Sequence, residues 1–167
     1  SYLSKTEMGY IFDTNIFIRS KNELPEDVWP TFWKKMAELI RDGKISSSIK
    51  VKEEINKGKD ELTEWIKKNT SSNFYINIDD SILGKYKEAQ DWANNNTNYK
   101  ESAKNEFANV ADAYLVATAA AKELTLVTYE IPAPTSKSRI KIPDACNALD
   151  VRYCDLNTAF RELGISI

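Results

Sequence analysis

The chain has 167 residues, of which 42% are hydrophobic and 29% charged, and its formal net charge is −2. This composition fits a single folded domain over residues 1–167 and argues against a disordered or fibrous chain. The sequence contains no His, which excludes Ser-His and Cys-His nucleophiles, a His general base and a His-ligated zinc site.

Two cysteines, Cys146 and Cys154, are too few for a four-thiolate metal site. No apolar run approaches the roughly 20 residues that a bilayer span requires, and no signal-peptide pattern is present. We therefore expect reduced thiols, a cytoplasmic location and no membrane association. With this net charge, any nucleic-acid binding must come from local clusters of basic side chains.

Five short segments, most of them apolar or alternating and followed by polar or turn-forming residues, predict strands. They are Tyr10–Phe12, Ile45–Ser48, Phe74–Ile78, Leu124–Thr128 and Val151–Tyr153. The Asp-Thr-Asn sequence that follows the first segment predicts a polar turn.

Apolar residues at helical spacing predict helices between and after these strands. One helix runs from Trp29, with Pro30 in its first turn, and ends before Gly43, and one follows Ser48. Another carries Leu62, Trp65 and Ile66, and one opens at Asp79 and Asp80. The alanine-rich stretch Glu101–Glu123 predicts one long helix, and Asp144–Leu149 and Leu156–Leu163 predict two short ones. Strands alternating with helices predict an α/β fold whose parallel sheet is covered on both faces, with ligands at the carboxyl ends of the strands.

Four carboxylates are expected near that edge of the sheet. Asp13 follows the first strand and Glu130 the fourth, whereas Glu54 and Asp112 lie on the helices after the second strand and before the fourth. Converging carboxylates repel one another unless a cation neutralises them, and oxygen ligands without His select Mg²⁺ or Mn²⁺. Such a site suits metal-assisted hydrolysis of a phosphodiester.

Each acid also has a purely structural interpretation. Asp13 could be a turn or helix N-cap residue, Glu54 a solvated helix acid, and Glu130 the end of a strand. Asp112 is harder to explain in this way, because it interrupts an apolar helix face where an unpaired charge is costly.

Four segments together resemble the PIN-domain family of metal-dependent nucleases, and the resemblance extends over most of the chain. They are YIFDTN at residues 10–15, VKEEI at 51–55, ADAYLVATA at 111–119 and LVTYE at 126–130. The first and third are fairly specific, and the second is weak in isolation. Residues 1–8 precede the family-like sequence, and we interpret them as an expression remnant or an alternative start.

The resemblance implies a three-layer sandwich around a central parallel sheet of about five strands in the order 3-2-1-4-5. It also implies an acidic pocket that binds Mg²⁺ or Mn²⁺, in which Asp13, Glu54 and Asp112 match the family's acids and Asn15 and Thr128 its polar residues. The implied activity is an endoribonuclease, the toxin half of a toxin–antitoxin pair. The expected partners are therefore RNA, a cognate antitoxin protein and a second copy of the chain as a homodimer.

The sequence departs from the family pattern after the fourth predicted strand. The family commonly has Thr-x-Asp there, whereas this chain has Thr128-Tyr129-Glu130, whose carboxylate reaches about one methylene further. Asp144, after a longer loop, is the other acid that could complete the pocket, and it could equally be a helix N-cap after Pro143. The family-like sequence therefore leaves open whether Glu130 or Asp144 completes the metal site.

The loop Ile131–Ile142 carries three basic residues and no acid, directly after Glu130. These residues, Lys137, Arg139 and Lys141, are candidates for phosphate contacts, together with Arg19 near Asp13. The alternative is a solvated loop whose charges serve solubility.

Other α/β enzymes fit the sequence less well. A receiver domain would need a paired acid after the first strand, and a haloacid-dehalogenase-type phosphatase would need Asp-x-Asp where this chain has Asp13-Thr14-Asn15. A non-catalytic PIN-like module that binds RNA or protein is the main alternative to the nuclease.

Overall fold

The computed structural model describes residues 9–167, and the interpretation of residues 1–8 as a remnant or alternative start lies outside that range. One parallel sheet of five strands, in the order β3-β2-β1-β4-β5, forms the centre of the fold. The strands are β1 (Tyr10–Phe12), β2 (Ile45–Ser48), β3 (Tyr75–Ile76), β4 (Thr125–Val127) and β5 (Tyr153–Cys154). The predicted fold class and strand order are confirmed.

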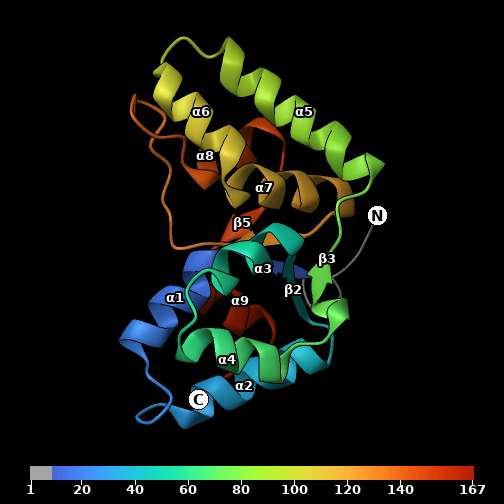
Figure 1. The fold of residues 1–167 in the computed structure, drawn as a ribbon, viewed down its shortest axis with the longest axis vertical. Coiled ribbons are helices and arrows are strands. Elements are labelled where there is room, and N and C mark those ends of the chain that lie inside the picture. The colour runs from blue at the N-terminus through green and yellow to red at the C-terminus, as the bar shows by residue number, and fades with distance from the viewer. Residues whose placement is uncertain (1–8) are drawn as a thin grey trace.

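Nine α-helices flank this sheet within the described residues. They are α1 (Thr14–Glu23), α2 (Pro30–Arg41), α3 (Ile49–Asn56), α4 (Glu61–Asn69), α5 (Asp80–Asn95), α6 (Glu101–Asn109), α7 (Ala111–Lys122), α8 (Ile142–Ala148) and α9 (Leu156–Glu162). In Figure 1, α5, α6, α7 and α8 lie above the sheet and α1, α2, α4 and α9 below it, which gives three layers.

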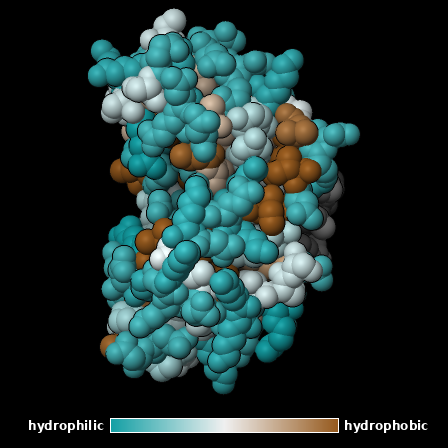
Figure 2. Space-filling model, in the orientation of Figure 1, coloured by the Kyte–Doolittle hydropathy of each residue, from teal (hydrophilic) through white to brown (hydrophobic). Residues whose placement is uncertain are grey.

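The central strands β1, β2 and β4 are mostly buried, and the apolar residues of this part of the sheet come chiefly from β1 and β4. Tyr10, Ile11 and Phe12 of β1 are fully buried, and they pair with Ile45–Ser46 of β2 on one side and Thr125–Val127 of β4 on the other. The hydrophilic surface in Figure 2 covers this core, with hydrophobic side chains in small separate groups. The parallel arrangement puts the carboxyl ends of β1 and β4 next to each other.

The long helix predicted over Glu101–Glu123 is wrong in one respect, because the structure divides it into α6 and α7. Val110 has an extended backbone, with φ of −106° and ψ of 169°, between the two helices. No Gly or Pro marks the break, so helical periodicity alone could not locate it. The break leaves the first backbone amides of α7 without partners in their own helix.

The turn predicted after β1 is the start of a helix that the sequence pattern did not reveal. Asp13 is the N-cap of α1, and its side chain accepts a long hydrogen bond of 3.4 Å from the Asn15 amide. The polar residues at the start and the low apolar content of the segment hid the helix. Helix α1 therefore begins at the edge of the sheet where ligands bind in α/β folds.

None of the helices in residues 9–167 is both long enough and apolar enough to cross a membrane.

Candidate metal centre

Asp13 lies at the carboxyl end of β1, at the centre of the site. Its side chain is 1% exposed and accepts a hydrogen bond of 3.1 Å from the Thr128 hydroxyl. Burial and the nearby Glu130 carboxylate raise the pKa of Asp13 to about 6, against the lowering effect of the Thr128 hydrogen bond. The structure therefore joins the two interpretations of Asp13, as a helix N-cap and as a member of the acidic pocket.

Asp112 reaches the same site from the first turn of α7. Burial, followed by the carboxylates of Asp13 and Glu130, raises the pKa of Asp112 to about 8, and the Arg139 guanidinium opposes this rise. The protein thus holds two neighbouring carboxyl groups whose charged forms it disfavours. Perturbed groups of this kind concentrate at functional sites.

Glu130 follows the end of β4, and both its backbone amide and its carboxylate make hydrogen bonds. Its backbone amide donates to the Thr128 hydroxyl at 3.1 Å, and its Oε1 accepts from the Ile142 amide at 3.2 Å. The other carboxylate oxygen, Oε2, is buried and has no hydrogen-bond partner. A buried acceptor without a partner is costly and is rare in folded proteins.

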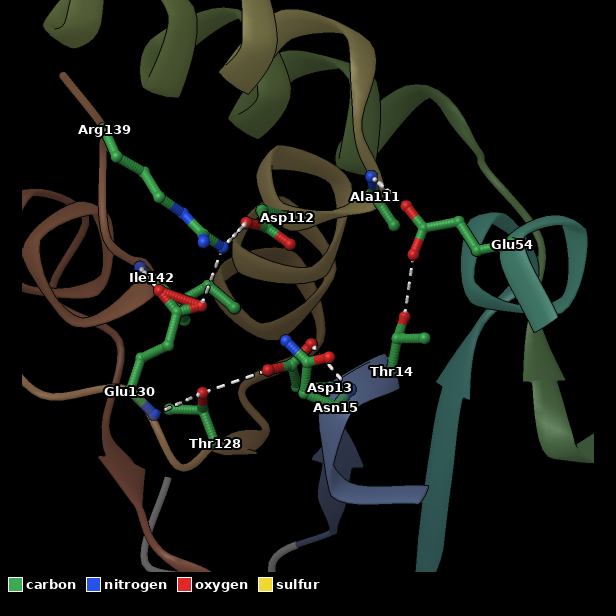
Figure 3. A network of polar contacts seen from close by, with 10 residues as sticks. All are labelled: Asp13, Thr14, Asn15, Glu54, Ala111, Asp112, Thr128, Glu130, Arg139 and Ile142. Atoms are coloured by element: carbon green, nitrogen blue, oxygen red, sulfur yellow. Dashed lines mark hydrogen bonds and ion pairs between the residues drawn. The ribbon is translucent and has the colours of Figure 1, made fainter. Parts of the chain in front are cut away.

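Glu54 stands on the other side of the site, as Figure 3 shows. Its Oε2 accepts a hydrogen bond of 3.0 Å from the Thr14 hydroxyl, and its Oε1 accepts one of 2.9 Å from the Ala111 amide. Of the charged groups that raise the pKa of Asp13 and Asp112, Glu54 has the smallest effect. Glu54 therefore joins α1, α3 and α7, and belongs to the rim of the acidic pocket.

Asp144 makes its contact elsewhere. It is buried in the first turn of α8, where Lys141 is the N-cap residue, and its Oδ2 accepts a hydrogen bond of 2.9 Å from the Ala133 amide. The helix N-cap interpretation of Asp144 is therefore wrong, because the helix begins two residues earlier, at Ile142. This contact ties the loop after Glu130 to α8.

The four basic residues predicted to bind RNA have different surroundings. The Arg139 Nη2 lies 3.6 Å from Glu130 and 3.9 Å from Asp112, inside the site, whereas Lys137 is exposed and Lys141 half-buried. Arg19 stacks on the Tyr129 ring, 4.4 Å from its centroid, and pairs with Glu23 at 2.9 Å.

A cavity of about 380 Å³ opens beside Asp13. Asn15, Arg19, Tyr129 and Glu130 are among its lining residues. The roles of Tyr129 and Thr14 could not be predicted from the sequence. Each residue lies next to a predicted site residue, Thr128 or Asp13, but this position in the sequence does not predict that Tyr129 stacks with Arg19 or that Thr14 donates to Glu54.

The donor set of the site consists of carboxylate and hydroxyl oxygens, which suits a hard cation such as Mg²⁺ or Mn²⁺. Glu130 Oε2 and the two carboxyl groups with raised pKa are the atoms that a cation would stabilise. As the side chains are arranged, however, no group of three or more acidic or Cys side chains within residues 9–167 could hold a metal ion. Metal binding would therefore require side-chain rotation, and Asp13, Asp112 and Glu130 are the residues placed to provide it.

Comparison with known families found a match over residues 10–167, nearly the whole chain, to the family described as Domain of unknown function (DUF4411). No curated protein sequence matches the chain. Because the matched region includes all five strands and every residue of the site, the chain belongs to the DUF4411 family.

Proposed function

We propose that the protein is a metal-dependent endoribonuclease of the PIN type that uses Mg²⁺ or Mn²⁺ to hydrolyse RNA. The observation that carries this proposal is the pair of buried carboxyl groups, Asp13 and Asp112, whose pKa values are raised by burial and by their acidic neighbours. Both lie at the carboxyl end of a parallel sheet, where α/β folds bind ligands. A divalent cation would relieve the repulsion that these groups experience.

In the proposed mechanism, Asp13, Asp112 and Glu130 would hold the metal. A divalent cation held there would supply an activated water and neutralise charge on the phosphate. The Thr128 hydroxyl orients the site, because it donates to Asp13 and accepts from the Glu130 amide. The contact of Asp144 with the Ala133 amide favours Glu130 over Asp144 as the acid that completes the pocket.

The basic side chains near the site would bind the RNA backbone. Arg139 lies beside Asp112 and Glu130, Arg19 lines the cavity, and Lys137 and Lys141 extend the positive charge along the loop of Arg139. Phosphate contacts of this kind position an RNA without reading its sequence.

A non-catalytic RNA-binding module is the second candidate. It is favoured by the absence, within residues 9–167, of three acidic side chains already arranged to hold a metal. The Arg139 ion pairs with Asp112 and Glu130 also favour it, because they neutralise the pocket without a metal.

The proposal includes a protein partner, either an antitoxin or a second copy of the chain. An apolar groove of about 500 Å³ supports it, with Trp29, Tyr129, Phe160 and Ile167 among its lining residues. Trp29 is 47% exposed and Ile167 61% exposed, which is high for large apolar side chains. Light scattering of the purified chain measures whether it forms a homodimer.

RNA cleavage in the presence and absence of Mg²⁺ or Mn²⁺ tests the proposed activity. The wild type should cut single-stranded or structured RNA only with the metal, and Asp112→Asn should abolish cleavage while RNA binding persists. The control is Asp91→Asn, the same substitution on the exposed surface of α5, which should retain activity. Cleavage by Asp112→Asn would assign the activity to a contaminant or another site, and a wild type that binds RNA but never cuts it would favour the non-catalytic module.

A further inference from the structure

Arg139 lies between two carboxylates of the candidate metal centre. Its Nη2 is 3.9 Å from Asp112 Oδ2 and 3.6 Å from Glu130 Oε2, and Figure 3 shows the guanidinium reaching in from the loop toward both. Both distances exceed those of a hydrogen bond. The guanidinium therefore offsets the charge of the pocket without being fixed in one geometry.

A second arginine provides the contrast. Arg152 directly precedes β5 and its side chain contacts β4 and α9. Its Nη1 donates to the Thr125 hydroxyl at 3.1 Å, and its Nη2 makes a very short contact with Glu162. Arg152 is thus held by close hydrogen bonds, as is usual for a structural Arg-carboxylate pair. Arg139 lacks such bonds, and its side chain is 43% exposed.

The backbone on both sides of Arg139 is fixed by hydrogen bonds. Asn98 Nδ2 donates to the carbonyl of Ser136 at 2.8 Å, and the Lys100 amide donates to the carbonyl of Lys137 at 2.9 Å. On the far side, the Ile142 amide donates to Glu130. The Arg139 side chain can therefore leave the pocket by rotating, without any rearrangement of the loop.

We infer that the Arg139 guanidinium is the resident counter-cation of Asp112 and Glu130, and that a divalent metal ion displaces it and turns it toward a phosphate of the RNA. This inference rests on the proposed function. Metal and guanidinium compete for the same two carboxylates, and their positive charges repel each other at short range. Once released, the planar guanidinium suits a pair of phosphate oxygens, which accept the bidentate hydrogen bonds that the pocket does not provide.

Competition predicts that removing the guanidinium tightens metal binding. Titration calorimetry with Mn²⁺ should give Arg139→Ala a dissociation constant lower than that of the wild type by roughly 5-fold or more, the lower end of the usual range for coupled sites. The matched control is Lys137→Ala, which removes one positive charge from the same loop at an exposed position. That variant should change the dissociation constant by less than about 2-fold, because the effect of an exposed charge is screened.

A second measurement follows the guanidinium directly. In protein labelled with ¹⁵N-arginine, Mg²⁺ should shift the Nε signal of Arg139, identified by its loss in Arg139→Lys, and leave the signal of Arg152 unchanged. A saturating Mg²⁺ titration that leaves the Arg139 signal unmoved would show that the guanidinium stays in place, which overturns the inference.

The outcomes separate this inference from the proposed function. If Mn²⁺ binds the wild type and Arg139→Ala equally well, or binds the variant more weakly, the metal site stands and the displacement inference fails. If neither protein binds Mn²⁺ at millimolar concentrations, both proposals fail. Binding by Arg139→Ala alone would support both, with Arg139 blocking the site in the wild type.

Discussion

The Glu54 carboxylate accepts a hydrogen bond of 2.9 Å from the backbone amide of Ala111, 57 residues away along the chain. The bond exists because the chain breaks at Val110, which leaves the first amide of α7 without a partner in its own helix. A carboxylate at this position also interacts favourably with the helix dipole. This contact places the first turn of α7, and with it Asp112, next to Asp13.

Glu54→Ala should destabilise the protein by about 1–3 kcal/mol, because it leaves the Ala111 amide and the Thr14 hydroxyl without their acceptor. Glu54→Gln should cost much less, since its amide oxygen can still accept from Ala111. Urea denaturation of the two variants checks the difference. Equal losses would show that the negative charge matters more than the hydrogen bonds.

The stability of the metal-free protein should fall as the pH rises from about 4 to 8. The pKa is raised to about 6 for Asp13 and to about 8 for Asp112, so the folded protein binds protons that the unfolded chain has already released. Their contribution is fully present below about pH 4 and is lost as the pH passes through each folded pKa. The two rises together amount to about 6 pKa units, so the expected loss is on the order of 8 kcal/mol, at about 1.4 kcal/mol per unit.

Denaturation in EDTA at pH 5, 6.5 and 8 measures this slope. Asp112→Asn should reduce the slope and be more stable than the wild type at pH 8. The carboxyl groups of Asp60 and Asp79, whose pKa is lowered by Lys21 and Lys122, lose their contribution only below about pH 4. A wild-type stability that is constant or rises over this range would contradict the raised pKa values.

Millimolar Mg²⁺ or Mn²⁺ should raise the melting temperature of the wild type, because a ligand that binds only the folded state stabilises it. The double variant Asp13→Asn/Asp112→Asn should show little response, since Asn retains the N-cap at position 13 but removes both charges. Thermal melts with and without the metal make the comparison. An equal rise in both proteins would place the bound metal elsewhere.

Changing Lys137, Arg139 and Lys141 together to Ala should weaken binding of single-stranded RNA. The slope of log K against log salt in EDTA should become shallower by up to about 1.4, at ~0.7 for each phosphate that the variant no longer neutralises, because without metal Arg139 stays beside Asp112 and Glu130. Fluorescence anisotropy over a salt series, with EDTA present to prevent cleavage, measures the slope.

The control replaces three exposed lysines by Ala, namely Lys34 of α2 and Lys67 and Lys68 of α4. Both helices lie at the bottom of Figure 1. This variant has the same change in net charge and should keep the wild-type slope. If both triple variants lose affinity equally, the binding depends on overall charge and the loop has no special role.

The parallel sheet and the helices on both its faces could be predicted from the sequence because they depend on local patterns, whereas the strand order came from the resemblance to the PIN-domain family. The apolar segment Tyr10–Phe12 is fully buried, and the helices between the strands impose parallel pairing. The same alternation placed Asp13 and Glu130 at one edge of the sheet. That prediction required only the parallel direction of the strands.

Helix boundaries within continuous patterns could not be predicted in this way. The sequence around Val110 keeps its helical periodicity, and the break becomes favourable only because Glu54, far away in the chain, accepts the freed amide. Helix α1 was missed for a related reason, since its start coincides with the polar residues of the site. In both cases the stabilising partner is remote in sequence.

The sequence by itself determined which charged groups surround the site, and the tertiary structure decided what each one contacts. Asp144 and Glu130 were equivalent candidates, yet one binds the Ala133 amide and the other lies beside Asp112 and Arg139. Arg139 was predicted to bind phosphate, and its position between two carboxylates depends on how the loop is held by Asn98 and Lys100. Side-chain partners across the fold depend on distance and burial, which arise only when separate segments pack together.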